Sequence, residues 1–461
     1  MREVLIKAIP FDDLKITELE GVQQVNEHGE LVFSGLMRGE KESEYISWAL
    51  KKNPLVSVNV CSDSGEEKIL FQGVLVDFEI QAQNDVRYLT GVLRTNTYLL
   101  DLIPHKRSFQ ADRLQYQNLL TTVNNGYTDS IFIMAKGAGS NIPGLVMQYD
   151  ETDWAFIKRM ASRFHTVVIP DSQRDHIAYT FGLPEDGVHY AVETNIFSIA
   201  KNAGQIIESE DQRMPRADTF FYVLNSREIY RLGDCVTLNG VPLRVYSIKT
   251  KMEGSELYHT YYLTSESGFE TEEVFNENLI GLSLDAQVTS VERDTVQVLI
   301  GCDENQAGCG TRVFPYATPD GTGWYCMPEI GDAVRLYFPC EKDADAYVAS
   351  SVHLQSSAGD ERINPDFKSI MNKQKKEILF TPGSLLLTNN AGMSIELSDA
   401  EGIKIISDKA IVVQSQEAVD ISSATSSLSI SAPQRIIFQQ GNTQMSLEEK
   451  LHFGGAQVRI D

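Results

Sequence analysis

The chain has 461 residues, more than one hydrophobic core usually supports, so about two to four domains are expected. Hydrophobic residues make up 42% and charged residues 23%, which is globular composition and excludes a wholly disordered or collagen-like protein. Acidic side chains number 64 against 40 Lys and Arg, and the net charge of -24 argues against nucleic acid as a partner.

The N-terminal residues, MREVLIKAIPFDD, contain no apolar run long enough for a signal peptide, and no stretch of about 18 uncharged apolar residues occurs anywhere. The cysteines lack C-x-x-C spacing and are too scattered for a secreted disulfide scaffold. We therefore expect assembly in a reducing cytoplasm. The six cysteines are Cys61, Cys235, Cys302, Cys309, Cys326 and Cys340.

Residues 1–280 alternate apolar and polar positions in short runs, for example at 55–60 and 69–78, broken by Asn, Gly and Pro. This pattern predicts mostly antiparallel β-structure. Two segments predict helices instead, one over 43–52, which Asn53 and Pro54 end, and one over 153–164.

The second helix carries an apolar stripe at three- and four-residue steps, which predicts a face that packs on a core. Its members are Trp154, Ile157, Met160, Ala161 and Phe164. Three cationic side chains on the same helix are expected to point away from that face; they are Lys158, Arg159 and Arg163.

Residues 281–356 form the second predicted domain. Strand-like runs between 283 and 354 are joined by turns at Pro319-Asp320-Gly321 and Ile330-Gly331-Asp332, which favours a small closed barrel. Residues 357–384 are polar and basic, with little apolar material to pack, so we interpret them as a linker.

Residues 385–461 contain a repeat in which apolar pairs, two residues apart, recur every eight or nine residues. Both members of a pair lie on one face of a strand, and Ser, Asp, Gln and Gly between the pairs supply turns. The pairs are Ile395 and Leu397, Ile403 and Ile405, Ile411 and Val413, Val419 and Ile421, Leu428 and Ile430, Ile436 and Phe438, and Met445 and Leu447.

An octad forms about one side of a β-helical coil, so one chain cannot close such a coil around its own core. Three chains winding together would supply three sides per layer and pair the open strand edges. The repeat therefore predicts an intertwined triple-stranded β-helix in a homotrimer. A solvated, low-complexity β-rich tail is the alternative, because Ser is abundant there.

Two motifs resemble the spike proteins of contractile phage tails, type VI secretion and extracellular injection systems, including the VgrG family and phage late-control proteins. The first is QYDETDWAFIKRMASRF, over 148–164. The second is GWYCMPEIGDAVRLYF, over 323–338, followed by DADAYVASSVH, over 343–353. Where relatives often carry Pro-Arg-Pro, this chain has Ala344-Asp345-Ala346, so a loop there is expected to differ.

The resemblance implies a mainly β protein with minor α-structure. Residues 1–280 would form a tail hub with two β-barrel-like subdomains, residues 281–356 an OB-fold barrel, and residues 385–461 a needle. It also implies a central spike that connects an inner tube to a membrane-piercing needle, assembled in the bacterial cytoplasm. Implied partners are tube and baseplate proteins, a PAAR-like tip-sharpening protein or effector at the C-terminus, and the target envelope.

A structural protein, not an enzyme, is expected. Some relatives carry a lysozyme-like domain between barrel and needle, but the interval here is too short for one. No His-Glu-x-x-His, Walker-type or Gly-x-Ser-x-Gly motif occurs. A receptor-binding tailspike and a spike with cell-wall hydrolase activity remain the alternatives.

Metal and cofactor sites are not expected, with two candidates left open. Cys302, Cys309, Cys326 and Cys340 fall in one small barrel, but their spacing fits no standard zinc site, so buried thiols are favoured. His452 lies near the C-terminus, where three copies could meet on a threefold axis and hold a metal; the alternative is an exposed histidine.

Overall fold

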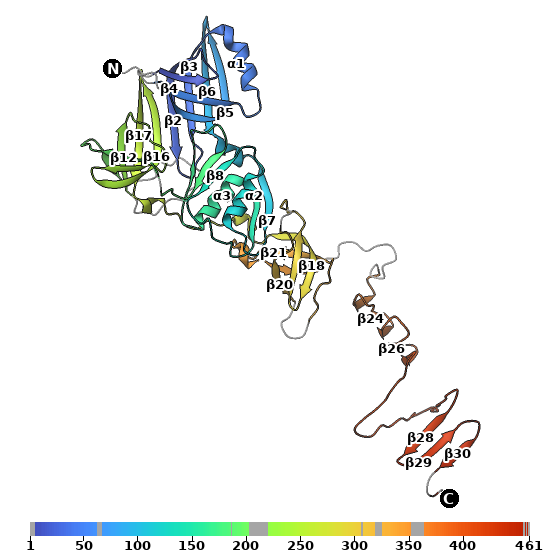
Figure 1. Ribbon diagram of the computed structural model, residues 1–461. Helices are drawn as coiled ribbons and strands as arrows, with labels where there is room; N and C mark the ends of the chain where they lie inside the picture. Colours follow the sequence, from blue (N-terminus) through green and yellow to red (C-terminus); the bar gives the residue numbers. More distant parts are fainter. Residues whose placement is uncertain are drawn as a thin grey trace. The chain divides into compact units, whose positions relative to one another are not determined.

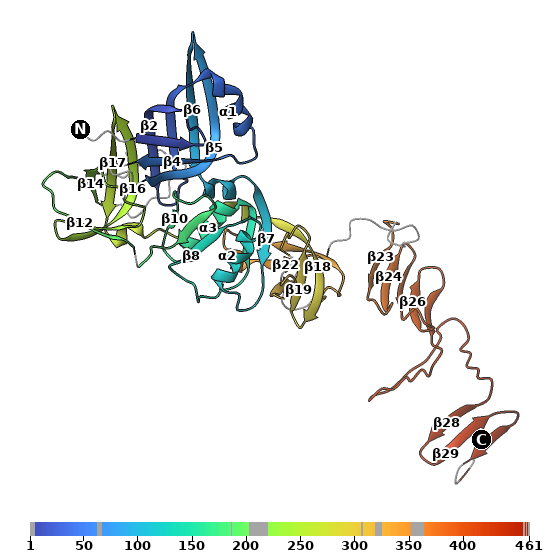
Figure 2. The same cartoon turned by 45° about the horizontal axis from the view of Figure 1, so that its top comes forward.

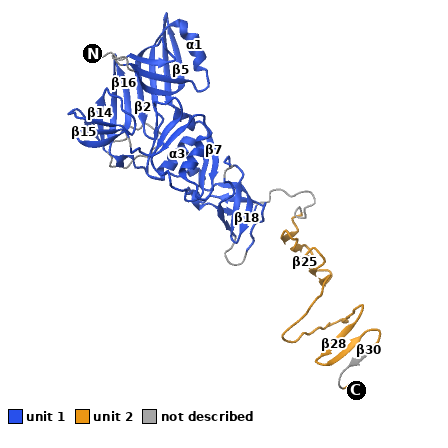
Figure 3. Ribbon diagram, viewed as in Figure 1, with its two compact units in different colours: residues 1–353 blue, residues 354–461 orange. Residues whose placement is uncertain are grey.

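The chain divides into two compact units, Met1–His353 and Leu354–Asp461 (Figure 3). The computed structural model describes residues 5–61, 67–185, 187–201, 220–305, 308–318, 325–351, 364–454, 457 and 459. The strands of both units pair mainly antiparallel, which confirms that the protein is mainly β, as predicted.

A 12-stranded sheet organises the first part of the first unit (Figure 1). Its two halves are joined where β2 pairs with β16. The pairing runs from Gln24 opposite Ser247 to Glu20 opposite Lys251. Alternate burial along β3 shows how the period-two pattern directs one face to a core. The strands are β1 (Leu5–Ile9), β2 (Lys15–Gln24), β3 (Glu30–Met37), β4 (Leu55–Cys61), β5 (Glu67–Gln83), β6 (Val86–Thr95), β12 (His189–Val192), β13 (Ser198–Ala200), β14 (Phe221–Ser226), β15 (Cys235–Leu238), β16 (Val241–Glu253) and β17 (Glu256–Thr264).

Each half of the sheet has its own apolar core. In the first, helix α1 (Glu42–Ala49) packs Tyr45 and Trp48 edge-on against Phe11, with ring centroids 5.0 and 5.4 Å apart. In the second, Tyr230 lies between two other tyrosine rings. The helix predicted over 43–52 is therefore present, and it ends earlier, at Ala49.

An α/β region lies between the sheet and the barrel (Figure 2). It holds α2 (Tyr116–Asn124), which was not predicted, and α3 (Asp153–Ser162), which was. The Thr152 hydroxyl begins α3 by accepting a hydrogen bond from the Ala155 N–H. The strands are β7 (Pro104–Phe109) paired with β9 (Val146–Thr152), and β10 (Val168–Pro170), β11 (Ala178–Phe181) and β8 (Ile131–Met134) in a second sheet.

The prediction that the cationic side chains of α3 all point away from the core needs a correction. Trp154, Ile157, Met160 and Ala161 are buried as predicted, but Arg159 is buried too, with 1% of its surface exposed. An arginine fits inside a protein only where carboxylates or carbonyls satisfy its charge and its N–H groups. The ion pairs that allow this are described below.

Five strands form the closed barrel that the sequence predicts. Its core is continuous with two side chains of the α/β region, Leu145 and Met147. At the turn between Glu329 and Asp332, Gly331 has φ +96°, which favours glycine. The strands are β18 (Ser283–Glu292), β19 (Thr295–Ile300), β20 (Val313–Ala317), β21 (Ala333–Tyr337) and β22 (Tyr347–Ala349). Short 3-10 helices complete the unit at Gly39–Lys41, Asn96–Asp101, Glu266–Phe269, Glu277–Leu279 and Asp343–Asp345.

The second unit holds two antiparallel meanders. The expected linker, 357–384, includes two of their strands, and residues 407–435, all of which are described, contain none. The first meander is β23 (Lys368–Met371), β24 (Glu377–Thr381), β25 (Ser384–Thr388), β26 (Ser394–Ser398) and β27 (Gly402–Ile406); the second is β28 (Ile436–Gln440), β29 (Thr443–Leu447) and β30 (Leu451–Gly454).

The longest helix that the structure describes is α3, with ten residues, and none of the described helices has the length and hydropathy of a membrane span.

Candidate functional site: apolar rows and a barrel junction

The first meander of the C-terminal unit presents one apolar face. Strand register aligns its side chains in two rows that cross the sheet, because residues opposite each other project to the same side. One row is Ile370, Ile378, Leu387, Ile395 and Ile405, and the other is Phe380, Leu385, Leu397 and Ile403.

The other face is more polar. Glu396 and Lys404 lie opposite each other there, next to Leu386, which is half-buried. Ser384 and Ser398 lie on this face at the ends of the strands. Leu379 lies opposite Leu386 on this face, so it is not wholly polar, but the two long apolar rows lie on the other side.

The chain itself does not cover this apolar face. Ile403 is 72% exposed and Ile405 59% exposed. Among the described residues of this unit, Ser446 alone has a buried side chain. A surface of this kind in a soluble protein marks a contact with another molecule.

The remaining predicted core pairs fall into two groups. In the second meander, Ile436 lies opposite Leu447 and Phe438 opposite Met445, so the structure brings these four together. The other three pairs lie in the strand-free stretch and are all more than half exposed; they are Ile411 and Val413, Val419 and Ile421, and Leu428 and Ile430.

The metal candidates gain no support from geometry. His452 lies opposite Ser446 in the strand register, and its side chain is outside the described residues. Within the described ranges no group of three or more metal-ligating side chains occurs. Burial, with a further contribution from Asp303, raises the pKa of the Cys309 thiol to about 11.

A buried ion cluster joins α3 to the barrel. Arg159 donates to Glu151 from Nε at 2.9 Å and to Asp343 from Nη1 at 3.4 Å, and its Nη2 donates to the Met147 carbonyl at 2.7 Å. Arg163 also binds Asp343. Burial alone would lower the pKa of Arg159, but the two carboxylates outweigh it and raise the pKa.

A second polar contact joins the barrel to β7. The Ser108 N–H donates to Asp303 at 2.8 Å, and the Asn305 amide donates to the Ser108 carbonyl at 2.7 Å. Next to them, His105 Nδ1 lies 2.7 Å from a carboxylate oxygen of Glu304. Together with the apolar core that the barrel shares with Leu145 and Met147, these contacts fix the barrel to the α/β region. Figures 1 and 2 both show β7 beside the barrel.

Sequence reasoning missed this junction because its partners are far apart in the chain. Arg159 and Asp343 are 184 residues apart, and Ser108 and Asp303 are 195 apart. No local signal points to it, because Arg159 lies on the side of the helix opposite the apolar stripe.

No family model and no curated protein sequence matches the chain. Solved structures do. The E. coli c3393 protein, a component of the type VI secretion system with structural similarity to the T4 bacteriophage tail proteins gp27 and gp5, is 11% identical with a TM-score of 0.55; the match covers 75% of this chain and 99% of that chain.

A chain of the Francisella PdpA-VgrG complex in its half-lidded form is 9% identical with a TM-score of 0.56, and the match covers 88% of each chain. The lidless form of the PdpA-VgrG complex gives the same identity and TM-score and covers 88% of this chain and 98% of that one. At these identities the likeness concerns the fold. The chain therefore shares its fold with the E. coli c3393 protein and with a chain of the PdpA-VgrG complex, which agrees with the resemblance that its sequence motifs indicate.

Proposed function

We propose that this protein is the homotrimeric central spike and hub of a contractile injection machine. Residues 1–280 would receive the inner tube, the barrel would connect hub to needle, and the C-terminal unit would pierce the target envelope. The fold similarity supports the class of machine. One observation carries the trimer: the apolar rows of the C-terminal unit are uncovered in the single chain.

Burial of these rows supplies the driving force for association. Two apolar side chains per strand from each of three chains give six per layer. At about 1.5 to 3 kcal/mol each, a layer gains roughly 9 to 18 kcal/mol before chain entropy is subtracted. Several such layers are enough to hold three chains together.

The strand-free stretch of residues 407–435 supports a three-chain arrangement. It has no strand partner among the described residues, yet it keeps the octad spacing of apolar pairs. Extended segments with open backbone groups pair readily with other strands. Two further copies of this chain, each in the same register, would supply those strand partners and close the triple-stranded β-helix.

The barrel junction supports a mechanical role. A spike transmits force along its length, which requires that the hub and the barrel move as one body. The buried pairs of Arg159 with Glu151 and Asp343 are geometrically specific and resist sliding. We infer that force transmission, not catalysis, is the function of this protein.

Partners follow from the same proposal. We expect a tube or tube-initiator protein above the hub, baseplate proteins around it, and a tip-sharpening protein or effector at the needle end, with assembly in the bacterial cytoplasm. The PdpA-VgrG structures are complexes of two different proteins, which supports the expectation of a further protein partner.

The test is the mass of the purified full-length protein by light scattering. We expect three times 51.5 kDa. A well-folded monomer would overturn the intertwined needle. Images of intact particles separate the rival receptor-binding fibre, because a spike lies once on the particle axis and fibres lie in several copies at the periphery. Loss of peptidoglycan turbidity on adding the protein would instead support the hydrolase alternative.

A further inference from the structure

Strand β5, with 17 residues, extends beyond both of the strands that pair with it. It pairs with β4 over 67–74 and with β6 over 73–83. Residues 75–83 therefore have β6 on one side and, in the part of the chain that the structure describes, no strand on the other. Figures 1 and 2 show this hairpin of β5 and β6 next to α1. An unpaired edge of this kind presents backbone groups that can pair with a further strand.

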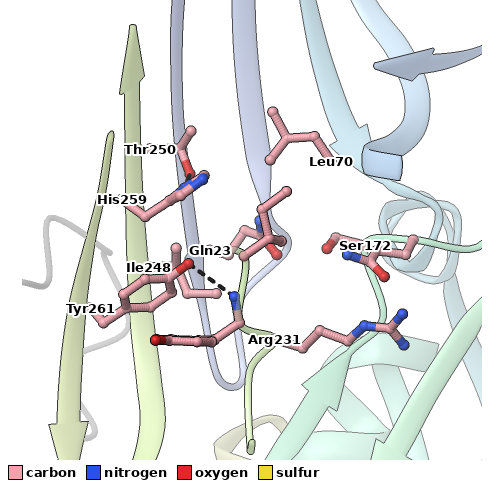
Figure 4. A pocket seen from close by; sticks show the side chains of 11 residues that line it. Gln23, Leu70, Ser172, Arg231, Ile248, Thr250, His259 and Tyr261 are labelled. Atoms are coloured by element: carbon pink, nitrogen blue, oxygen red, sulfur yellow. Dashed lines mark hydrogen bonds between the residues drawn. The ribbon is translucent and has the colours of Figure 1, made fainter. Parts of the chain in front are cut away.

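At the opposite end of β5, where β6 no longer pairs, another segment covers the edge. The Gln72 N–H donates to the Ser172 carbonyl at 2.6 Å. Leu70, at this end of the strand, lines the same small pocket as Ser172 (Figure 4). On the β4 side, the Leu75 N–H donates to the Pro54 carbonyl at 2.9 Å. The uncovered part of the edge therefore begins beyond Leu75.

The register fixes which backbone groups of β5 face the uncovered edge. In an antiparallel sheet, alternate residues of a strand bond to the neighbour on one side, and the residues between them bond to the neighbour on the other. The Thr95 N–H at the end of β6 donates to the Gly29 carbonyl, just before β3, at 2.9 Å, which sets the alternation along β6. Through the pairing of β6 with β5, the residues whose backbone groups face away from β6 are Phe78, Ile80 and Ala82.

These edge groups are largely unpaired. The Phe78 N–H donates to the carboxylate of the adjacent Asp77 at 2.8 Å. Among the described residues, the N–H groups of Ile80 and Ala82 have no hydrogen-bond acceptor. A strand laid along this edge would supply acceptors to both of them.

The inner face of the hairpin is already occupied. Phe78 and Ile80 pack against the first apolar core. Arg87 of β6, which lies opposite Ala82, binds Glu42 of α1 with its Nε at 3.1 Å. A partner therefore meets the edge of β5 and the outer face of the hairpin.

The outer face along this edge is acidic. Asp77 and Glu79 are two residues apart and both exposed, so they project to the same side. The Gln81 amide donates to Glu79 at 3.0 Å and holds its carboxylate along the strand. The only cationic residue between 75 and 92 is Arg87, which is paired with Glu42 on the inner face. Because opposite charges across two strands stabilise their pairing and like charges destabilise it, this edge selects a cationic strand.

We propose that residues 77–83 of β5 bind an extended cationic segment of another protein, which joins the sheet as an added strand. Lys or Arg at alternate positions of that segment would lie opposite Asp77 and Glu79, and its backbone would pair with Ile80 and Ala82. The proposal deepens the proposed function, on which it rests for expecting the segment in a tube or baseplate protein.

A second copy of this chain fits the edge less well. Two copies of the same edge would pair about a twofold axis, whereas the proposed assembly is threefold. Their pairing would also bring Asp77 and Glu79 of one copy close to the same carboxylates of the other. A partner of opposite charge avoids this repulsion.

Fluorescence anisotropy of a labelled peptide tests the proposal on the full-length protein. The probe alternates Lys and Thr over about seven residues, an ordinary strand length, and a matched peptide has Glu in place of Lys. We expect only the Lys peptide to bind, with an affinity that falls as salt is added. Glu79→Lys should weaken this binding severalfold and allow the Glu peptide to bind. Glu18→Lys, at an exposed glutamate of β2, is the matched control and should change neither affinity.

Ala82→Pro tests the backbone pairing. Proline removes the N–H at the edge but no hydrogen bond between β5 and β6, because the Ala82 N–H faces away from β6. We expect binding of the Lys peptide to be lost while the tryptophan fluorescence of the folded protein stays unchanged. Ala82→Ser keeps the N–H and should bind the Lys peptide as the wild type does.

Equal binding of the two peptides by the wild type would overturn the proposal, and so would binding of neither or an unchanged affinity in Ala82→Pro. If Ala82→Pro fails to fold, the change of peptide preference in Glu79→Lys still decides the question. A mass that falls in Ala82→Pro without added peptide would assign the edge to a second copy instead. A monomeric wild type that binds the Lys peptide would reject the needle and keep this edge, and a trimer that binds no peptide would do the reverse.

Discussion

The two units of this chain place their apolar side chains in opposite ways. Met1–His353 buries them in four clusters, whereas no described apolar side chain beyond Val348 is buried. Both units nevertheless show the same period-two alternation of side chains along their strands. The difference teaches that alternation specifies a strand and its apolar face, and that topology decides whether the same chain or another copy covers that face.

The largest expected effect breaks the C-terminal unit. Ile411→Asp would place a carboxylate from each of three copies at the predicted axis, at several kcal/mol per buried charge. We expect the mass to fall from trimer to monomer in light scattering. Val412→Asp is the control, because in the predicted strand Val412 would project to the face opposite Ile411, and it is 80% exposed.

Tryptophan fluorescence extends this experiment to the first unit. All three tryptophans, Trp48, Trp154 and Trp324, belong to residues 1–353. Their unfolding transition should therefore be unchanged in Ile411→Asp. A variant that stays trimeric with unchanged melting would show that Ile411 does not face the axis.

A smaller effect is expected at the barrel junction. Arg159→Met leaves the mostly buried Glu151 without its cation and Asp343 with Arg163 alone, so the free energy of unfolding should fall by about 3 kcal/mol in urea, followed by tryptophan fluorescence. Lys158→Met, the next residue on α3, should change it by less than about 1 kcal/mol. Equal effects of the two substitutions would mean that the junction does not depend on this ion cluster.

The smallest effect is a pH dependence within the first unit. The pKa of His259 is about 4 in the folded protein and near its ordinary value of 6.5 when unfolded, so the unfolded chain binds the extra proton. This contribution is fully present above pH 6.5 and is lost as the pH falls toward 4, by about 3 kcal/mol in total.

The measurement compares unfolding free energies at pH 7 and pH 4.5 in low chloride. His259→Gln should show a smaller decrease than the wild type, because Gln does not titrate. A decrease of the same size in both would assign the pH dependence to other groups.

Several elements of the fold could be predicted from the sequence because their signals are local. Alternation predicted the strands, the apolar stripe predicted α3, and the turn at Gly331 helped to predict the barrel. The repeat of apolar pairs identified side chains that the structure leaves exposed, although their contact with other copies stays a prediction.

Other elements depend on information that a linear pattern does not carry. The lysines between 368 and 376 favoured a linker, yet Ile378 and Phe380 form an apolar pair like the octad pairs and continue the rows upstream. Arg159 was expected to point outward because its partner Asp343 is supplied by another domain. Polarity alone cannot reveal such a pairing.

The first meander also has a consequence for the order of folding. Each strand from β23 to β26 pairs with the strand that follows it, so the contacts of this meander are local, and hairpins of this kind form within microseconds. Residues 407–435 have no such local partners in the part of the chain that the structure describes. We expect the meander to form early in each chain and to nucleate association, after which the chains wind together toward the C-terminus. The octad repeats are similar enough that the three chains could pair in a shifted register. A nucleus at one end would fix the common register before these repeats come into contact.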